Sequence, residues 1–154
     1  MFDLSTVDPN LVYLVLIFGL WTSVTAVHIA GTGVLEVIAV AGLFAGIVAL
    51  TQMPTNWLAV LLTVVGTSTF MVAPFIKRQL GAYALGGLAL QAVGGLLLFN
   101  EGPGVSPFVV ALTVILPLAY YRYILAPMLE HAVGKPVVEK DDMLIGQTGR
   151  VVKP

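Results

Sequence analysis

The chain has 154 residues, of which 58% are apolar and 10% are charged, with a net charge of −1 and no cysteine. A soluble domain has roughly 45–50% apolar and about 25% charged residues, so this composition predicts a protein embedded in a lipid bilayer. The weak net charge excludes a basic surface for nucleic acid. The lack of cysteine excludes disulfides, thiolate metal sites and a cysteine nucleophile.

Four long stretches contain no Asp, Glu, Lys or Arg: residues 9–35, 37–76, 79–100 and 102–121. A helix needs about 20 apolar residues to cross the hydrocarbon core, so the longest stretch holds two spans. Backbone groups in lipid must pair internally, and these runs lack the alternating polar residues of a membrane β-barrel. We therefore predict an all-α polytopic membrane domain over residues 1–128, with about five transmembrane helices at 9–28, 33–51, 56–74, 80–99 and 107–126.

Proline, glycine and short polar residues mark the predicted helix ends. Asp8–Pro9 supplies a capping side chain followed by proline at the first helical position, and Ser106–Pro107 repeats this arrangement before the fifth helix. The glycines of Gly31–Gly33 break the chain between the first two helices. Pro54 ends the second helix, and we expect Thr55 to cap the third.

The few charged residues indicate how the chain is oriented. With five spans, basic residues gather on one side of the membrane: Lys77, Arg78, Arg122, Lys135 and Lys140. Basic residues favour the cytoplasmic side, so we predict that the N-terminus is outside and the C-terminus inside. A four-span arrangement would place the Lys77–Arg78 pair and the basic tail on opposite sides.

Small residues form two candidate helix-packing faces. The second helix carries Gly42 and Gly46, and the fourth carries a larger set, namely Ala82, Gly86, Gly87, Gly94 and Gly95. Small residues let membrane helices approach one another closely. We expect these faces to pack within the chain. The alternative is contact with another protein, including a second copy of this chain.

Glu36 is the acid nearest to a membrane-embedded stretch. It lies within a turn of the Gly31–Gly33 break, so we predict an interfacial ion pair with Lys77 or Arg78, whose loop faces the same side. Intramembrane carboxylates also mark ion paths, and the alternative function is therefore a small channel or transporter with Glu36 near its pathway. Transporters keep polar groups near the midplane, whereas we expect the polar groups here to cluster at the helix ends.

The sequence contains no pattern typical of catalysis. It has no nucleophile–base arrangement, no dinucleotide or phosphate-binding glycine motif, and no metal-ligand spacing. We predict no catalytic residue, no metal, no cofactor and no small-molecule substrate. Pro117 lies inside the fifth helix, where it should kink the helix and free the carbonyl of Thr113.

The end of the chain has a different character. Residues 129–142 read as a polar linker, and residues 143–154 read as the start of a β-structure with a turn between Gly146 and Gly149. The run from Leu144 to Val152 resembles the opening of the small β-barrel (OB-fold) domain of NfeD-like proteins. Three further segments are similar to the membrane helices and loops of that family: Pro54–Ala59, Leu80–Gly87 and Gly94–Asn100.

The resemblance covers nearly the whole chain and implies a short form of the family, without the N-terminal ClpP-class serine protease domain of longer relatives. NfeD-like proteins are thought to bind stomatin/prohibitin-like (SPFH) membrane proteins, whose oligomers organise membrane patches. The resemblance thus implies a non-enzymatic accessory or scaffold protein that binds an SPFH oligomer and serves membrane microdomains or membrane-protein quality control. We expect it in a bacterial inner membrane, with a cytoplasmic C-terminal domain.

Overall fold

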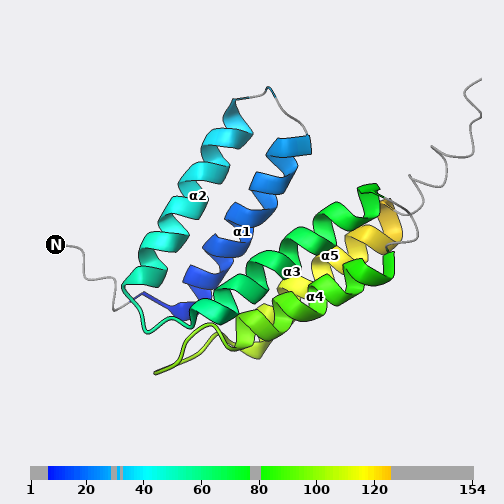
Figure 1. Ribbon diagram of the computed structural model, residues 1–154. Coiled ribbons are helices and arrows are strands. Elements are labelled where there is room, and N and C mark those ends of the chain that lie inside the picture. Colours follow the sequence, from blue (N-terminus) through cyan, green and yellow to red (C-terminus); the bar gives the residue numbers. More distant parts are fainter. Residues whose placement is uncertain (1–6, 29–30, 32, 77–80, 126–154) are drawn as a thin grey trace, which may run out of the picture. The chain divides into compact units, whose positions relative to one another are not determined.

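The computed structural model describes residues 7–28, 31, 33–76 and 81–125. Its regular elements, in chain order, are α1 (Pro9–His28), α2 (Val34–Thr51), α3 (Trp57–Ile76), α4 (Gly81–Leu96), α5 (Pro107–Tyr120) and a π-helix (Tyr121–Leu125) that continues α5 (Figure 1). The prediction of an all-α domain with five helices is confirmed for this part of the chain. The predicted linker (129–142) and the predicted OB-fold start (143–154) lie outside the described residues.

The loops at one end of the helices are joined through their backbones. Thr55 and Phe99 form an antiparallel bridge. On either side of it, the Asn56 N–H donates to the Leu98 carbonyl at 2.9 Å and the Asn100 N–H donates to the Pro54 carbonyl at 2.9 Å. We call this pairing of residues 54–56 with 98–100 the loop bridge. It explains why α4 ends at Leu96, three residues before its predicted end, since the next residues leave the helix to make these bonds.

The helix ends follow local chemistry, with one exception. Asp8 accepts a hydrogen bond from the Asn10 N–H through Oδ1 at 2.8 Å, which caps α1 as predicted. The prediction that Thr55 caps α3 is wrong. Asn56 caps it, with Oδ1 accepting from the Leu58 N–H at 3.1 Å. Thr55 instead donates from Oγ1 to the Leu50 carbonyl at 2.7 Å and closes the end of α2.

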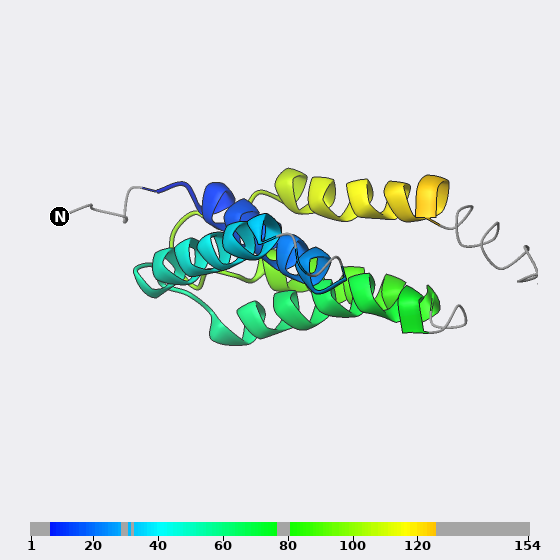
Figure 2. The ribbon, with the colours of Figure 1, turned by 90° about the horizontal axis from the view of Figure 1, so that it is seen from above.

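Two helical hairpins make up most of the close packing. α1 packs on α2, α3 packs on α4, and α1 also approaches α3 (Figure 2). A pair of glycines lies at a close approach of the two helices in each hairpin. A Cβ added to Gly42 would lie 3.2 Å from the Cα of Gly19, and a Cβ added to Gly87 would lie 2.6 Å from the carbonyl oxygen of Gly66. α5 takes little part in such close backbone contact.

The apolar core gathers around one face of α1. Five residues of α1 are buried, and their spacing places them on one face of the helix: Val12, Tyr13, Leu16, Ile17 and Leu20. They cluster with Leu50 of α2 and with Leu98, Val105 and Val110. All of these residues belong to one compact unit, which extends to Leu116, and a second unit begins at Pro117.

The outward faces of the helices are apolar. Phe18, Phe44, Leu61, Leu85 and Ile115, one from each helix, are all more than half exposed. Among the described residues, α1 and α2 combine the length and composition of a membrane span, with mean hydropathies of 1.8 and 2.3. A core helix of a soluble protein would be mostly buried, whereas 17% of the α2 window is buried. Exposed apolar surface on this scale is typical of helices that face lipid or other membrane helices.

Candidate functional site

Several polar side chains are buried between the helices, away from the helix ends. Five of them are buried, with exposed fractions from 0% to 6%: Tyr13 of α1, Thr63 and Thr67 of α3, Gln91 of α4 and Thr113 of α5. We call these five residues the polar network. They correct the expectation that polar groups cluster at the helix ends. Of these five residues, the sequence had drawn attention to Thr113 alone.

Thr113 is the junction of the polar network. Its Oγ1 donates to the Val110 carbonyl at 2.9 Å, so its proton is already used within α5. The Tyr13 hydroxyl lies 2.8 Å from the same Oγ1 and is therefore the donor of that bond. Gln91 Nε2 donates to the Thr113 carbonyl at 3.3 Å and lies 3.5 Å from its Oγ1. One residue of α5 is thus bonded to both α1 and α4.

The other end of the Gln91 amide is held by α3. Gln91 Oε1 accepts from Thr67 Oγ1 at 3.1 Å, and the same hydroxyl lies 2.8 Å from the Thr63 carbonyl. Thr63 in turn donates from Oγ1 to the Ala59 carbonyl at 2.9 Å. Every side chain of the polar network therefore has a hydrogen-bond partner inside the protein. A buried polar group that lacks a hydrogen-bond partner in an apolar medium costs roughly several kcal/mol.

Two glycines of α4 lie directly against residues of the polar network. A Cβ on Gly94 would collide with the Thr63 side chain and lie 2.6 Å from the Ala59 carbonyl oxygen. A Cβ on Gly95 would lie 2.8 Å from the ring of Tyr13. These two glycines let α4 approach both α3 and the buried tyrosine, which brings Gln91 within reach of its partners.

The other small residues predicted to pack have mixed positions. Gly42 and Gly46 face α1, next to Gly19 and Leu16 respectively. Gly87 faces α3, whereas Gly86 is exposed and a Cβ there would meet no atom within 4 Å. Five of the seven predicted small residues thus pack inside the chain. Gly86 does not, and the side chain of Ala82 lies outside the described residues.

Glu36 lies in the first turn of α2 and is half-buried. Its Oε1 accepts a hydrogen bond from the Gly31 N–H at 3.0 Å, and Gly31 itself has a φ of 101°, a conformation that glycine adopts without strain. The carboxylate therefore closes the loop between α1 and α2. The predicted ion partners Lys77 and Arg78 lie outside the described residues, so that ion pair stays a prediction.

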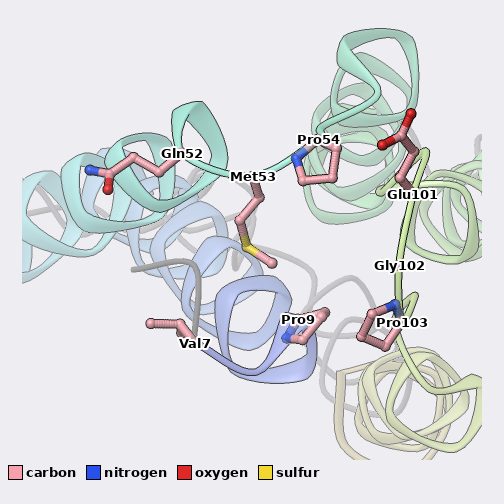
Figure 3. Close-up of a pocket in the computed structure, with 8 residues that line it drawn as sticks. All are labelled: Val7, Pro9, Gln52, Met53, Pro54, Glu101, Gly102 and Pro103. Atoms are coloured by element: carbon pink, nitrogen blue, oxygen red, sulfur yellow. The ribbon is translucent and has the colours of Figure 1, made fainter. Parts of the chain in front are cut away.

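A pocket of about 350 Å³ opens beside the loop bridge (Figure 3). Its lining comes from the start of α1, the α2–α3 loop and the α4–α5 loop, namely Val7, Pro9, Gln52, Met53, Pro54, Glu101, Gly102 and Pro103. The Met53 side chain projects between the loop and α1. Proline rings and aliphatic groups dominate this lining, and Glu101 is its one ionisable side chain. The lining pairs no nucleophile with a base, which catalysis by acyl or proton transfer would need.

Metal-binding and nucleophilic groups are likewise scattered in the part of the chain that the structure describes. No group of three His, Cys, Asp or Glu side chains comes together within those residues. The serine and threonine hydroxyls of α1 are bonded to their own helix, as in Ser23, which donates to the Gly19 carbonyl at 2.7 Å. The polar network, which joins four helices through hydrogen bonds, is therefore the main polar site of the described chain.

The sequence did contain a signal for this site. Gln91 is the one amide side chain between residues 80 and 99, in the middle of a predicted span. A lone amide at membrane depth must find a partner on another helix, and it is functional or structural by default. Tyr13 offered no such signal, because its partner Thr113 is 100 residues away in the sequence.

Comparison with known proteins identifies a family. The NfeD integral membrane domain matches residues 10–126, a range that begins in the first turn of α1 and ends just after the π-helix. Searches of the curated proteins and of the solved structures each found no match. The matched range includes every residue of the polar network and most of the chain. The chain therefore belongs to the family of the NfeD integral membrane domain.

Proposed function

We propose that this protein is a non-enzymatic membrane accessory protein that binds a stomatin/prohibitin-like (SPFH) oligomer and helps to organise membrane microdomains or membrane-protein quality control. The observation that carries the proposal is the match of the NfeD integral membrane domain to residues 10–126. The resemblance of the chain to short NfeD-like proteins supplies the partner class. Scaffold proteins of this kind need a stable helical body and an outer surface suited to lipid or to other membrane helices.

The arrangement of the helices supports a membrane body that crosses the bilayer five times. The loop bridge joins the α2–α3 loop to the α4–α5 loop, and the Ser106 N–H donates to Asn10 Oδ1 at 2.7 Å, which joins the second of these loops to the start of α1. The start of α1 and both loops thus lie at one end. Successive helices must then run in opposite directions. Basic residues such as Lys77 and Arg122 follow the third and fifth spans in the sequence, so this body would have its N-terminus outside and its C-terminus in the cytoplasm of a bacterium.

The internal bonding of the polar network supports a structural role for the polar residues. A transporter presents polar groups to a substrate pathway, usually at broken helices near the midplane. Here the five buried polar side chains are bonded to one another or to helix carbonyls. These hydrogen bonds would fix the positions of four helices relative to one another, which is a structural role.

Co-purification in mild detergent tests the proposal. The tagged protein, expressed in its own host, should bring down an SPFH protein, and an unrelated multi-pass protein with the same tag should not. A photo-crosslinking residue placed at each exposed position in turn should then map the contact: Phe18, Phe44, Leu61, Leu85 and Ile115, with buried Leu98 as the matched control. Capture of no SPFH protein, with the membrane domain intact, would overturn the proposed function.

A further inference from the structure

The pocket beside the loop bridge has walls that the fold holds in place. Three segments form it: the start of α1, the α2–α3 loop and the α4–α5 loop. The loop bridge joins the two loops, and the Ser106 N–H, which donates to Asn10 Oδ1 at 2.7 Å, joins the α4–α5 loop to α1. Met53 projects between these walls and packs against the apolar core (Figure 3). The shape of the pocket therefore does not depend on a ligand.

The lining offers a ligand strong hydrogen-bond acceptors and few donors. Three of its eight residues are prolines, which have no N–H. The N–H groups of Gln52 and Met53 already donate to the Ala49 and Leu50 carbonyls, at 3.1 and 3.3 Å. Five of the eight lining residues thus have no backbone N–H to give to a ligand. The Glu101 carboxylate accepts hydrogen bonds only, so the pocket suits a ligand that donates them.

The charges around the pocket favour a cation. Residues 7–57 and 97–116 include every lining residue and contain no Lys or Arg, whereas Glu101 lies on one side of the pocket, across from Val7 (Figure 3). A quaternary ammonium such as choline has no N–H and binds to the faces of aromatic rings. None of the eight lining residues is aromatic. A primary ammonium group, with three N–H donors, therefore fits this lining better than choline or an anion does.

The pocket lies at the ends of the apolar spans. Pro9 begins the first span and Gln52 directly follows the second, which ends at Thr51. Trp57, three residues after Pro54, begins α3 and is 55% exposed. Tryptophan is enriched where the hydrocarbon core meets the headgroups, so the lining residues are placed at the level of the headgroups. Lipid headgroups surround a membrane protein at this level, and they are the amines that reach the pocket most often.

We propose that this pocket binds the headgroup of an ethanolamine phospholipid, whose ammonium group donates to the Glu101 carboxylate. Val7, Pro9 and Met53 supply apolar contacts for the two methylene groups next to the amine. A volume of about 350 Å³ is near the lower end of the range for small-molecule sites, about 300–1,000 Å³. The pocket thus suits a headgroup, while the acyl chains stay in the bilayer beside the exposed apolar faces of the helices.

Photo-crosslinking of the full chain in nanodiscs tests the proposal. The nanodiscs contain equal amounts of dioleoyl phosphatidylethanolamine and dioleoyl phosphatidylcholine, and mass spectrometry identifies the lipid attached. A benzoylphenylalanine at Gln52, an exposed lining residue, should attach to the ethanolamine lipid in preference to the choline lipid. The matched control is the same group at Leu61 of α3, which is 57% exposed and lies outside the pocket. It should attach to both lipids in equal amounts.

Two variants and one further lipid test the role of the carboxylate. Glu101→Gln keeps the size of the side chain and removes its charge. An exposed ion pair changes an affinity about 2- to 5-fold, so the preference seen from Gln52 should fall by that factor. Glu36→Gln removes a carboxylate outside the pocket and should leave the preference unchanged. Dimethylated phosphatidylethanolamine keeps the charge with one N–H, and it should compete less well than the unmethylated lipid.

Several results would overturn the proposal. One is equal attachment of the two lipids from Gln52, and another is the same preference from Leu61. A preference that survives Glu101→Gln would also overturn it. Attachment of Gln52 to a protein in native membranes, without any lipid preference in nanodiscs, would assign the pocket to a lysine side chain of a partner instead. The nanodiscs contain no SPFH protein, so these measurements succeed or fail separately from the proposed function.

Discussion

The neighbouring glycines Gly86 and Gly87 allow a direct test of the helix packing. Both lie in α4, but a Cβ on Gly86 would meet no atom within 4 Å. A Cβ on Gly87 would lie 2.6 Å from the Gly66 carbonyl oxygen and 2.8 Å from the Phe70 nitrogen. Both atoms are backbone and cannot rotate away. The change Gly87→Ala should therefore destabilise the protein, and Gly86→Ala should not.

The size of the effect follows from the distances. The Cβ at Gly87 falls about 0.8 Å short of the 3.4 Å at which ordinary contact begins, so α3 and α4 would have to separate by a similar amount. Overpacking of this kind costs about 1–3 kcal/mol. Both substitutions gain the same helix propensity, up to about 1 kcal/mol, so the difference between the variants isolates the steric cost.

Reversible unfolding in mixed micelles, followed by tryptophan fluorescence and circular dichroism, measures this difference. We expect the free energy of unfolding of Gly87→Ala to lie about 1–3 kcal/mol below that of Gly86→Ala. Equal stabilities would refute the reasoning, because they would mean that α3 and α4 do not approach each other at Gly87. A lower stability for Gly86→Ala would show that its exposed face is occupied.

Three other predictions concern the polar network, the topology and the alternative function. Tyr13→Phe removes the hydroxyl that joins α1 to α5 and should lower the free energy of unfolding by about 0.6–1.7 kcal/mol, whereas Tyr83→Phe, at an exposed position, should leave it unchanged. A cysteine at Glu101 should react with a membrane-impermeant maleimide added outside intact cells, and a cysteine at Val34 should react only after permeabilisation. If the protein is not a channel or transporter, liposomes that contain the purified protein should show no ion flux that depends on Glu36; the Glu36→Gln variant and the unchanged protein should behave alike.

Each of these has a clear opposite outcome. Equal losses of stability in Tyr13→Phe and Tyr83→Phe would mean that the buried Tyr13 hydroxyl contributes no more to stability than the exposed Tyr83 hydroxyl. Labelling of both cysteines from the outside, or of neither, would exclude the five-span arrangement with an outer N-terminus. A flux that Glu36→Gln abolishes would favour the channel or transporter over the accessory protein.

The sequence predicted the helices well because their limits depend on neighbouring residues. Charge-free stretches set the spans, and Pro9, Pro54 and Pro107 set ends that the structure reproduces to within a few residues. Prediction from the sequence failed where two neighbouring residues could both cap the same helix. Thr55 and Asn56 both suit a helix cap, and the choice between them depends on the Leu50 carbonyl, which is available only after α2 has folded.

The polar network depended on tertiary structure and was largely missed. The freed carbonyl of Thr113 was predictable from Pro117 four residues later, but the identity of its new donor was not, since Gln91 lies on another helix. Likewise, Gly86 and Gly87 look equivalent in the sequence. A helix places adjacent residues about 100° apart, so both cannot face α3 equally.

The loop bridge places an unusual constraint on the chain. Its bonds join backbone groups of Pro54, Asn56, Leu98 and Asn100, so they are indifferent to most side chains at these positions. They do depend on the number of residues, because one inserted or deleted residue would shift the pairing and leave donors without acceptors. Among natural variants of this domain, we therefore expect these two segments to keep their length. Exchanges of amino acid should be tolerated where the side chain has no further role, unlike Thr55 and Asn56, which bond to helix ends, and Leu98, which is buried in the core.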